Sequence, residues 1–194
     1  MKAHFSILLL LLVSYLTNAQ EIRKCDDKNA YWLFGKDSSS YIVRLEGTLK
    51  STQTDRVIVL EGHPLQYVIV YKAKYMEGIA GKDTASFMPL ITYAQSEGEY
   101  ISGQFGNKLE LNLDNQSKGK MKILLWYYKM PISVSTDVKH QLIANVIIGD
   151  KIIGLSTSQF NDQNFDDVRK FLIKEIATLK EVKELTDLEK LCKK

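Results

Sequence analysis

Aromatic side chains are the most distinctive candidates for binding chemistry in this 194-residue sequence. Tyr67, Tyr71 and Tyr75 are spaced by four residues, so an extended strand would place their rings on one face of a sheet. Trp126 and Tyr128 share a face of another predicted strand. Such rings suit the wall of a ligand pocket, because they combine apolar area with polar tips. They equally suit a half-buried sheet face beneath a helix, since strands are rich in aromatic residues.

General acid–base chemistry would depend on His63 and His140, the two histidines of residues 20–194. His63 lies between Gly62 and Pro64 in a predicted turn, and His140 lies where a predicted strand begins. A hydrolase would need folding to bring one of these imidazoles to a carboxylate, because the chain contains no GxSxG, HExxH or phosphate-binding glycine motif. The alternative for both histidines is a non-catalytic surface position.

Three polar residues, Asp162, Asn164 and Asp166, alternate like the start of a calcium-binding loop. Such a loop needs glycine and glutamate at two later positions, which here are Asp167 and Ile173. The beginning of a helix explains the same three residues without a metal ion. We therefore expect no metal site, and the sequence indicates no cofactor.

The first nineteen residues have the three parts of a secretory signal peptide. A short basic start precedes the apolar run Phe5–Leu16, and small residues precede a cleavage site after Ala19. The run is shorter than the roughly 20 residues that a membrane span needs. We therefore expect residues 1–19 to be removed and residues 20–194 to form a secreted or periplasmic domain. The alternative is a signal anchor that stays attached.

Export determines what the two cysteines are expected to do. Cys25 lies near the start of the mature chain and Cys192 near its end, and an oxidising compartment favours their pairing. In the chain-entropy model, a disulfide that closes a loop of this length stabilises the folded protein by at most about 5 kcal/mol. Neither cysteine has a CxxC partner or a neighbouring histidine, so we expect a structural disulfide. Two free thiols are the alternative.

The composition is that of an ordinary globular domain, with 45% hydrophobic and 25% charged residues. The formal net charge of +3 is too small to indicate a nucleic-acid-binding protein. No stretch after the leader is apolar enough to be a membrane span. The expected partner is thus an unidentified protein or small-molecule ligand, with neither nucleic acid nor a membrane span involved.

The elements that would position these side chains are mostly strands. Alternating and β-branched patterns extend over most of residues 29–160, and they predict strands at Leu65–Tyr75 and Met88–Ala94. Met121–Met130 is apolar on both faces, which is typical of a central strand.

Two hairpins are also predicted. Glu99–Phe105 and Lys108–Leu113 are expected to pair around Gly106-Asn107. Leu142–Ile148 and Lys151–Leu155 are expected to pair around a second glycine turn.

The hydrophobic period changes after residue 160. Apolar residues in Phe165–Leu179 recur every three or four positions, which predicts an amphipathic helix. Asn164 suits the N-cap of that helix. Thr186 and Glu189 have the spacing of a capping box that would open a last short helix.

The pattern as a whole predicts one α+β domain over residues 20–194. It would contain roughly eight or nine mostly antiparallel strands, a C-terminal amphipathic helix packed on the sheet, and a short last helix. A closed barrel with the helix outside is the alternative. We expect an exported, non-enzymatic domain that binds a partner or ligand. An envelope hydrolase and a structural or assembly protein remain the other hypotheses.

Overall fold

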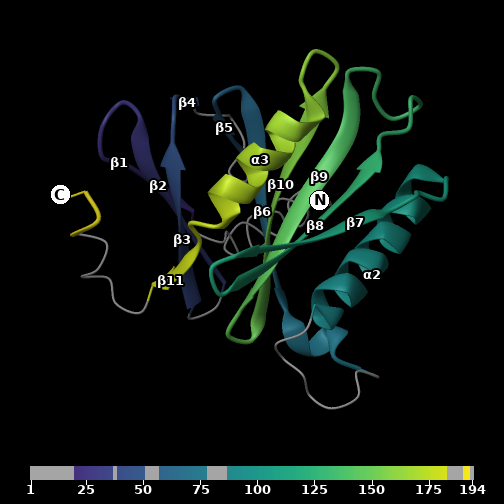
Figure 1. The fold of residues 1–194 in the computed structure, drawn as a ribbon, viewed down its shortest axis with the longest axis horizontal. Helices are drawn as coiled ribbons and strands as arrows, with labels where there is room; N and C mark the ends of the chain where they lie inside the picture. Colours follow the sequence, from purple (N-terminus) through teal and green to yellow (C-terminus); the bar gives the residue numbers. More distant parts are fainter. Residues whose placement is uncertain (1–19, 37–38, 51–56, 78–86, 183–189, 193–194) are drawn as a thin grey trace, which may run out of the picture.

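The computed structural model describes residues 20–36, 39–50, 57–77, 87–182 and 190–192. Over these residues eleven strands form two antiparallel sheets, and two α-helices pack against them (Figure 1). This is the α+β class that the sequence predicts, although the strands are more numerous than expected. Each sheet runs linearly between two edge strands, so neither closes on itself within the described residues.

The smaller sheet joins the two ends of the described chain. Its strand order is β1 (Glu21–Lys24), β2 (Asn29–Lys36), β3 (Ser39–Glu46) and β11 (Lys180–Val182). Alternate residues of β2 and β3 enter the core that this sheet shares with the larger one, as the period of two requires. These core residues are Ala30, Trp32, Phe34, Tyr41, Val43 and Leu45.

The larger sheet has seven strands and carries the candidate site on one face. Its strand β8 lies between β7 and β9, so the predicted central strand is confirmed. Strands β9 and β10 form the predicted hairpin, which turns at Gly149 with a φ of 59°. The strand order is β4 (Leu49–Lys50), β5 (Val57–Leu60), β6 (His63–Tyr71), β10 (Lys151–Phe160), β9 (Val138–Ile148), β8 (Met121–Lys129) and β7 (Asn112–Lys118).

Helix α3 (Phe165–Ile176) is the amphipathic helix that the sequence predicts. The Asn164 side chain caps it by accepting hydrogen bonds from the backbone amides of Asp166 (2.9 Å) and Asp167 (3.2 Å). Its buried apolar residues join the core beneath it. The helix therefore packs on β9 and β10 of the larger sheet and also contacts β3 of the smaller one.

Helix α2 (Met88–Phe105) corrects two predictions, because a strand was expected at Met88–Ala94 and a hairpin arm at Glu99–Phe105. Pro89 stands in the first turn, where a helix tolerates proline. Gly106 has a φ of 67° and ends the helix as a left-handed cap instead of turning a hairpin. Short apolar runs fit both a strand and a buried helix, which is why periodicity alone misassigned this segment.

Strand β6 ends at Tyr71, earlier than the predicted Leu65–Tyr75. A 3-10 helix, η2 (Lys72–Tyr75), follows directly. Tyr75 therefore leaves the sheet, and its ring meets that of Tyr93 on α2 edge-on at a centroid distance of 5.1 Å.

The two faces of the larger sheet are covered by different elements (Figure 1). One face packs against α3 and the smaller sheet and forms the main hydrophobic core. The opposite face packs against α2 and forms a second core. Strands β6, β8, β9 and β10 contribute to both cores, because successive side chains point to opposite faces.

The chain ends are joined by the predicted disulfide between Cys25 and Cys192, whose Cα atoms are 5.1 Å apart. The bond links positions 167 residues apart in sequence. The predicted signal peptide (1–19) and the predicted capping box (186–189) lie outside the described residues. Among the described helices, none combines the length and the apolar character that a membrane crossing demands.

Candidate functional site: a cleft between helix α2 and the larger sheet

Strand pairing places four side chains in a row across the α2 face of the larger sheet. Gln66 of β6 lies opposite Ser156 of β10, and Ser156 lies opposite Ile143 of β9. Ile143 in turn lies opposite Trp126 of β8. Directly paired residues of neighbouring strands point to the same face. The row therefore brings an amide, a hydroxyl, an aliphatic chain and an indole together.

A second row continues this surface. Gln141 of β9 lies opposite Tyr128 of β8 and opposite Ser158 of β10. The Ser158 hydroxyl donates a hydrogen bond of 2.8 Å to the Gln141 Oε1, which holds the amide in place. The ring of Tyr128 lies 6.4 Å from that of Trp126 in the first row, measured between centroids.

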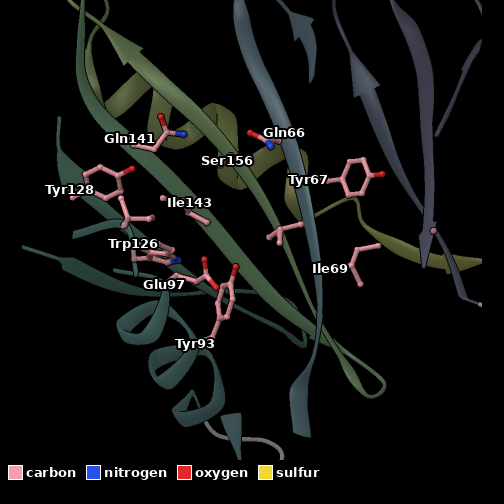
Figure 2. A pocket seen from close by; sticks show the side chains of 13 residues that line it. Gln66, Tyr67, Ile69, Tyr93, Glu97, Trp126, Tyr128, Gln141, Ile143 and Ser156 are labelled. Atoms are coloured by element: carbon pink, nitrogen blue, oxygen red, sulfur yellow. The ribbon is translucent and has the colours of Figure 1, made fainter. Parts of the chain in front are cut away.

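Helix α2 forms the opposing wall. Tyr93, Glu97 and Ile101 follow one another at intervals of four, so they lie on one side of the helix. Figure 2 shows Tyr93 and Glu97 pointing from α2 toward the sheet. The cleft between them has a volume of about 590 Å³. It is lined by Gly35, Gln66, Tyr67, Val68, Ile69, Tyr93, Glu97, Ile101, Trp126, Tyr128, Gln141, Ile143 and Ser156.

Glu97 is the one charged side chain among the described residues that line the cleft. Burial raises the pKa of its carboxyl, and the charge of Lys74 acts in the opposite direction. Burial is the main reason why the pKa of Tyr93 is raised, and electrostatic interactions with Glu97 and Tyr75 raise it further. Burial also raises the pKa of Tyr128. Both tyrosine hydroxyls therefore remain protonated at neutral pH and can donate hydrogen bonds.

Trp126 is held by a buried hydrogen bond. Its Nε1 donates to the Oδ1 of Asn145 at 2.6 Å. Space for the Asn145 amide exists because residue 154 is a glycine: a Cβ there would lie 2.3 Å from the Asn145 Nδ2 and 2.8 Å from a methyl of Val68. The indole N–H is thus already engaged, and the ring is what Trp126 can offer to a ligand.

The structure divides the aromatic residues that the sequence singled out. Tyr67, Trp126 and Tyr128 line the cleft, whereas Tyr71 and Tyr75 do not. The expectation that all three tyrosines share one strand face is wrong, because β6 ends before Tyr75. Trp126 and Tyr128 share a face, as predicted, and belong to the core under α2.

Tyr67 and Tyr71 lie on the other side of the larger sheet. The Tyr67 ring stacks on Phe34 at a centroid distance of 4.4 Å and meets Trp32 edge-on at 5.3 Å. It reaches the margin of the cleft around β6, where Figure 2 shows it pointing away from α2. Tyr71 is 40% exposed, and the Lys151 Nζ lies 3.2 Å from the centre of its ring.

Both histidines are packed near α3, on the face opposite the cleft. The Nδ1 of His140 and the Oε1 of Gln159 share a hydrogen bond of 2.7 Å. The His63 ring stacks on Phe171 at 4.3 Å, and burial lowers the pKa of His63. No hydrogen bond joins either imidazole to a carboxylate in the described part of the chain. The arrangement that a hydrolase would need is therefore not seen there.

The residues that imitate a calcium loop belong to the start of α3. The side-chain oxygen of Asn164 caps this helix by accepting two backbone hydrogen bonds. In the ranges that the structure describes, no group of three or more His, Cys, Asp or Glu side chains is arranged to hold a metal ion.

A second, smaller hollow of about 410 Å³ lies between α3 and β7. Cationic side chains line it, but Arg169 already pairs with Asp114, and Lys174 pairs with Glu46 at 3.2 Å. We assign no ligand to it, since internal carboxylates already neutralise much of its charge. The described lining residues are Gln116, Lys118, Arg169, Lys170, Ile173, Lys174, Ala177 and Thr178.

Sequence reasoning missed the α2 wall of the cleft. The predicted strands Met88–Ala94 and Glu99–Phe105 contain Tyr93 and Ile101 and leave Glu97 between them, so they do not place the three residues on one side of a helix. The signal was present in the spacing of Leu90, Tyr93, Glu97 and Ile101, which repeats every three or four positions. Pro89 at the start of this stretch was a second sign of a helix.

No protein-family model matches the chain, and no curated protein sequence matches it. Among solved structures it is similar to cyanobacterial PsbP (CyanoP) from Synechocystis sp. PCC 6803, determined in solution. The sequences are 12% identical, the match covers 73% of this chain and 86% of that chain, and the TM-score is 0.49. We draw no functional argument from a likeness at this level.

Proposed function

We propose that the protein is an exported, non-enzymatic binding protein that holds a small, partly apolar ligand in the cleft between α2 and the larger sheet. The observation that carries this proposal is the lining of the cleft. Aromatic and aliphatic side chains surround a few polar groups that come from α2, β6, β9 and β10. Ligand pockets typically have this composition and volumes of roughly 300–1,000 Å³.

Binding without catalysis is favoured by what the cleft contains. Its described lining has one carboxylate and no histidine, lysine, arginine or cysteine. Acid–base catalysis commonly uses two titratable groups with separated pKa values. His63 and His140 belong to the other face of the sheet and do not line the cleft. The hydrolase hypothesis therefore receives no support from this site.

Export is part of the same proposal. Its support is the sequence of residues 1–19 together with the Cys25–Cys192 disulfide, which an oxidising compartment favours. Mass spectrometry of the protein recovered from the culture medium or the periplasm should give a chain that begins at Gln20. A native chain that still begins at Met1 would overturn this part of the proposal.

Ligand binding can be tested with Nile red, a neutral dye whose emission shifts in apolar surroundings. We expect the mature protein to bind it saturably. Ser156→Phe should weaken binding at least tenfold, because the new ring occupies the floor of the cleft. Ser117→Phe, at an exposed position of β7, is the matched control and should bind like the unmodified chain. Circular dichroism should show that both variants are folded.

The structural or assembly hypothesis makes the opposite prediction. If the cleft serves only packing, the dye should not bind saturably, or its binding should not change in Ser156→Phe. Each of these two outcomes would overturn the binding proposal.

A further inference from the structure

Glu97 has an unusual position for a carboxylate. Its side chain is half-buried on α2 and faces the larger sheet across the cleft (Figure 2). Within the described residues it forms no ion pair and accepts no hydrogen bond. The charge of Lys74 on η2 acts on this carboxyl from a distance, but Lys74 does not line the cleft. Among the described residues, the carboxylate in the cleft thus has no ion-pair partner, and only the more distant charge of Lys74 offsets it.

Partial burial of an unpaired carboxylate is unfavourable, and a positively charged partner offsets part of that cost. The raised pKa of Glu97 reflects the same desolvation. Gln66, Gln141 and Ser156 are neutral, and burial keeps the hydroxyls of Tyr93 and Tyr128 protonated at neutral pH. No described side chain of the lining can therefore supply the positive charge.

The rings around Glu97 favour a cation as well. Tyr93 lies one turn before Glu97 on α2, and Trp126 and Tyr128 lie on the facing strand β8. The face of an aromatic ring attracts cations, tryptophan most strongly. The Trp126 N–H is already bound to Asn145 and the side chain is almost fully buried, so the part of its ring that lines the cleft is what Trp126 offers to a cation.

We propose that the cleft binds an organic cation: an ammonium or quaternary ammonium group lies against Glu97 and the rings of Tyr93, Trp126 and Tyr128, and its apolar part rests on Ile101 and Ile143. This inference rests on the proposed function, since it names the ligand class of the same site. Anionic ligands are disfavoured, because the described lining offers them no cation and one repelling carboxylate.

The test compares three small probes that share a benzene ring and differ in the head group. Phenethylamine is a cation at neutral pH, 2-phenylethanol is neutral, and phenylacetate is an anion. Isothermal titration calorimetry with the mature protein should show the amine binding at least tenfold tighter than the alcohol. Phenylacetate should bind more weakly than both. Equal affinities for the amine and the alcohol would overturn the cation assignment.

Glu97→Gln tests the counter-charge directly. It should remove the tenfold preference for the amine and leave the affinity for the alcohol within about twofold. Glu99→Gln is the control, because Glu99 is an exposed carboxylate on the same helix. That variant should keep the preference. A preference that survives Glu97→Gln would overturn the proposal.

The pH dependence of the unmodified protein gives a second readout if the Glu97 variant does not fold. Affinity for the amine should rise as pH increases through the titration of Glu97, while affinity for the alcohol stays constant. The charge of Lys74 acts on this carboxyl. The carboxylate in turn acts on Tyr75 and Tyr93, whose pKa values are both raised, so neither phenol ionises in the acidic range. Identical pH profiles for the two probes would overturn the proposal.

The two proposals fail separately. If Nile red binds and Ser156→Phe abolishes its binding, but the amine shows no advantage, the cleft is a binding site and only its ligand class is wrong. If neither the dye nor any of the three probes binds, the binding function itself is wrong.

Discussion

The indole Nε1 of Trp126 donates a hydrogen bond of 2.6 Å to the Oδ1 of Asn145, and both side chains are buried in the larger sheet. The two residues lie on neighbouring strands, in adjacent rows of the same face. This bond determines how the largest ring of the cleft is oriented. Substitution of Asn145 can therefore show how much this buried polar contact contributes to the stability of the protein.

Asn145→Leu should lower the free energy of unfolding by about 1–3 kcal/mol, because the buried Trp126 N–H loses its acceptor. The double variant Trp126→Phe/Asn145→Leu should cost less than the sum of the single variants, since it removes donor and acceptor together. Urea denaturation measures all three. Asn112→Leu on the exposed surface of β7 is the control and should change stability little. Strict additivity would contradict a coupled pair.

Gly154→Ala should destabilise the protein by about 1–3 kcal/mol, because the added methyl group would overlap the Asn145 amide and Val68. Gly103→Ala is the matched control in α2, where nothing lies within 4 Å of the new Cβ. It should stabilise the protein by roughly 0.5–1 kcal/mol through helix propensity. Thermal unfolding followed by circular dichroism would measure both. Equal effects of the two substitutions would contradict this packing.

Loss of the disulfide should weaken the fold as a whole. Cys25→Ser/Cys192→Ser should lower the unfolding free energy by about 2–5 kcal/mol, since the bond closes most of the chain into one loop. The purified native protein should migrate faster on a gel without reductant than with it. Migration that does not depend on reductant would show that the thiols are free.

Glu175 should make stability depend on pH. It is 1% exposed. Burial and the negative charge of Glu46 raise its pKa from 4.5 to about 7, although the positive charge of Lys174 acts in the opposite direction. The folded protein therefore keeps a proton that the unfolded chain releases, so stability should fall as pH rises from 4.5 to 7. Glu175→Gln should remove this fall and raise the unfolding free energy at pH 8 by about 1–3 kcal/mol.

Urea denaturation between pH 4 and pH 8 would measure the Glu175 effect. The exposed Glu110→Gln is the control and should retain the pH dependence of the unmodified protein. A Glu175→Gln profile that falls as steeply as the control would show that another group controls this dependence.

Asn164→Ala should destabilise the protein by about 1 kcal/mol, because two amides at the start of α3 lose their acceptor. Asn164→Ser preserves a capping oxygen and should recover most of that stability. Chemical denaturation compares the two variants. If Asn164→Ala and Asn164→Ser have the same unfolding free energy, the capping oxygen does not stabilise the helix.

Several elements follow from the sequence alone because their signals are local. The helix after Asn164 combines a capping side chain with an apolar residue every three or four positions. The β9–β10 hairpin combines two apolar strands with a glycine turn, and the inner position of β8 follows from its unbroken apolar run. The pairing of Cys25 with Cys192 follows from their number and from the expected export.

The sequence by itself thus determined the α+β class, helix α3, the last hairpin and the disulfide of this protein. Tertiary structure decided that Met88–Phe105 is a helix, that Tyr75 leaves the sheet, and that Glu97 faces Trp126. The physical reason is that these relationships depend on which strands pair and which face a helix covers. A short apolar segment becomes helix or strand according to the surface available for its burial, and that surface is assembled from β6, β8, β9 and β10, which are distant in sequence.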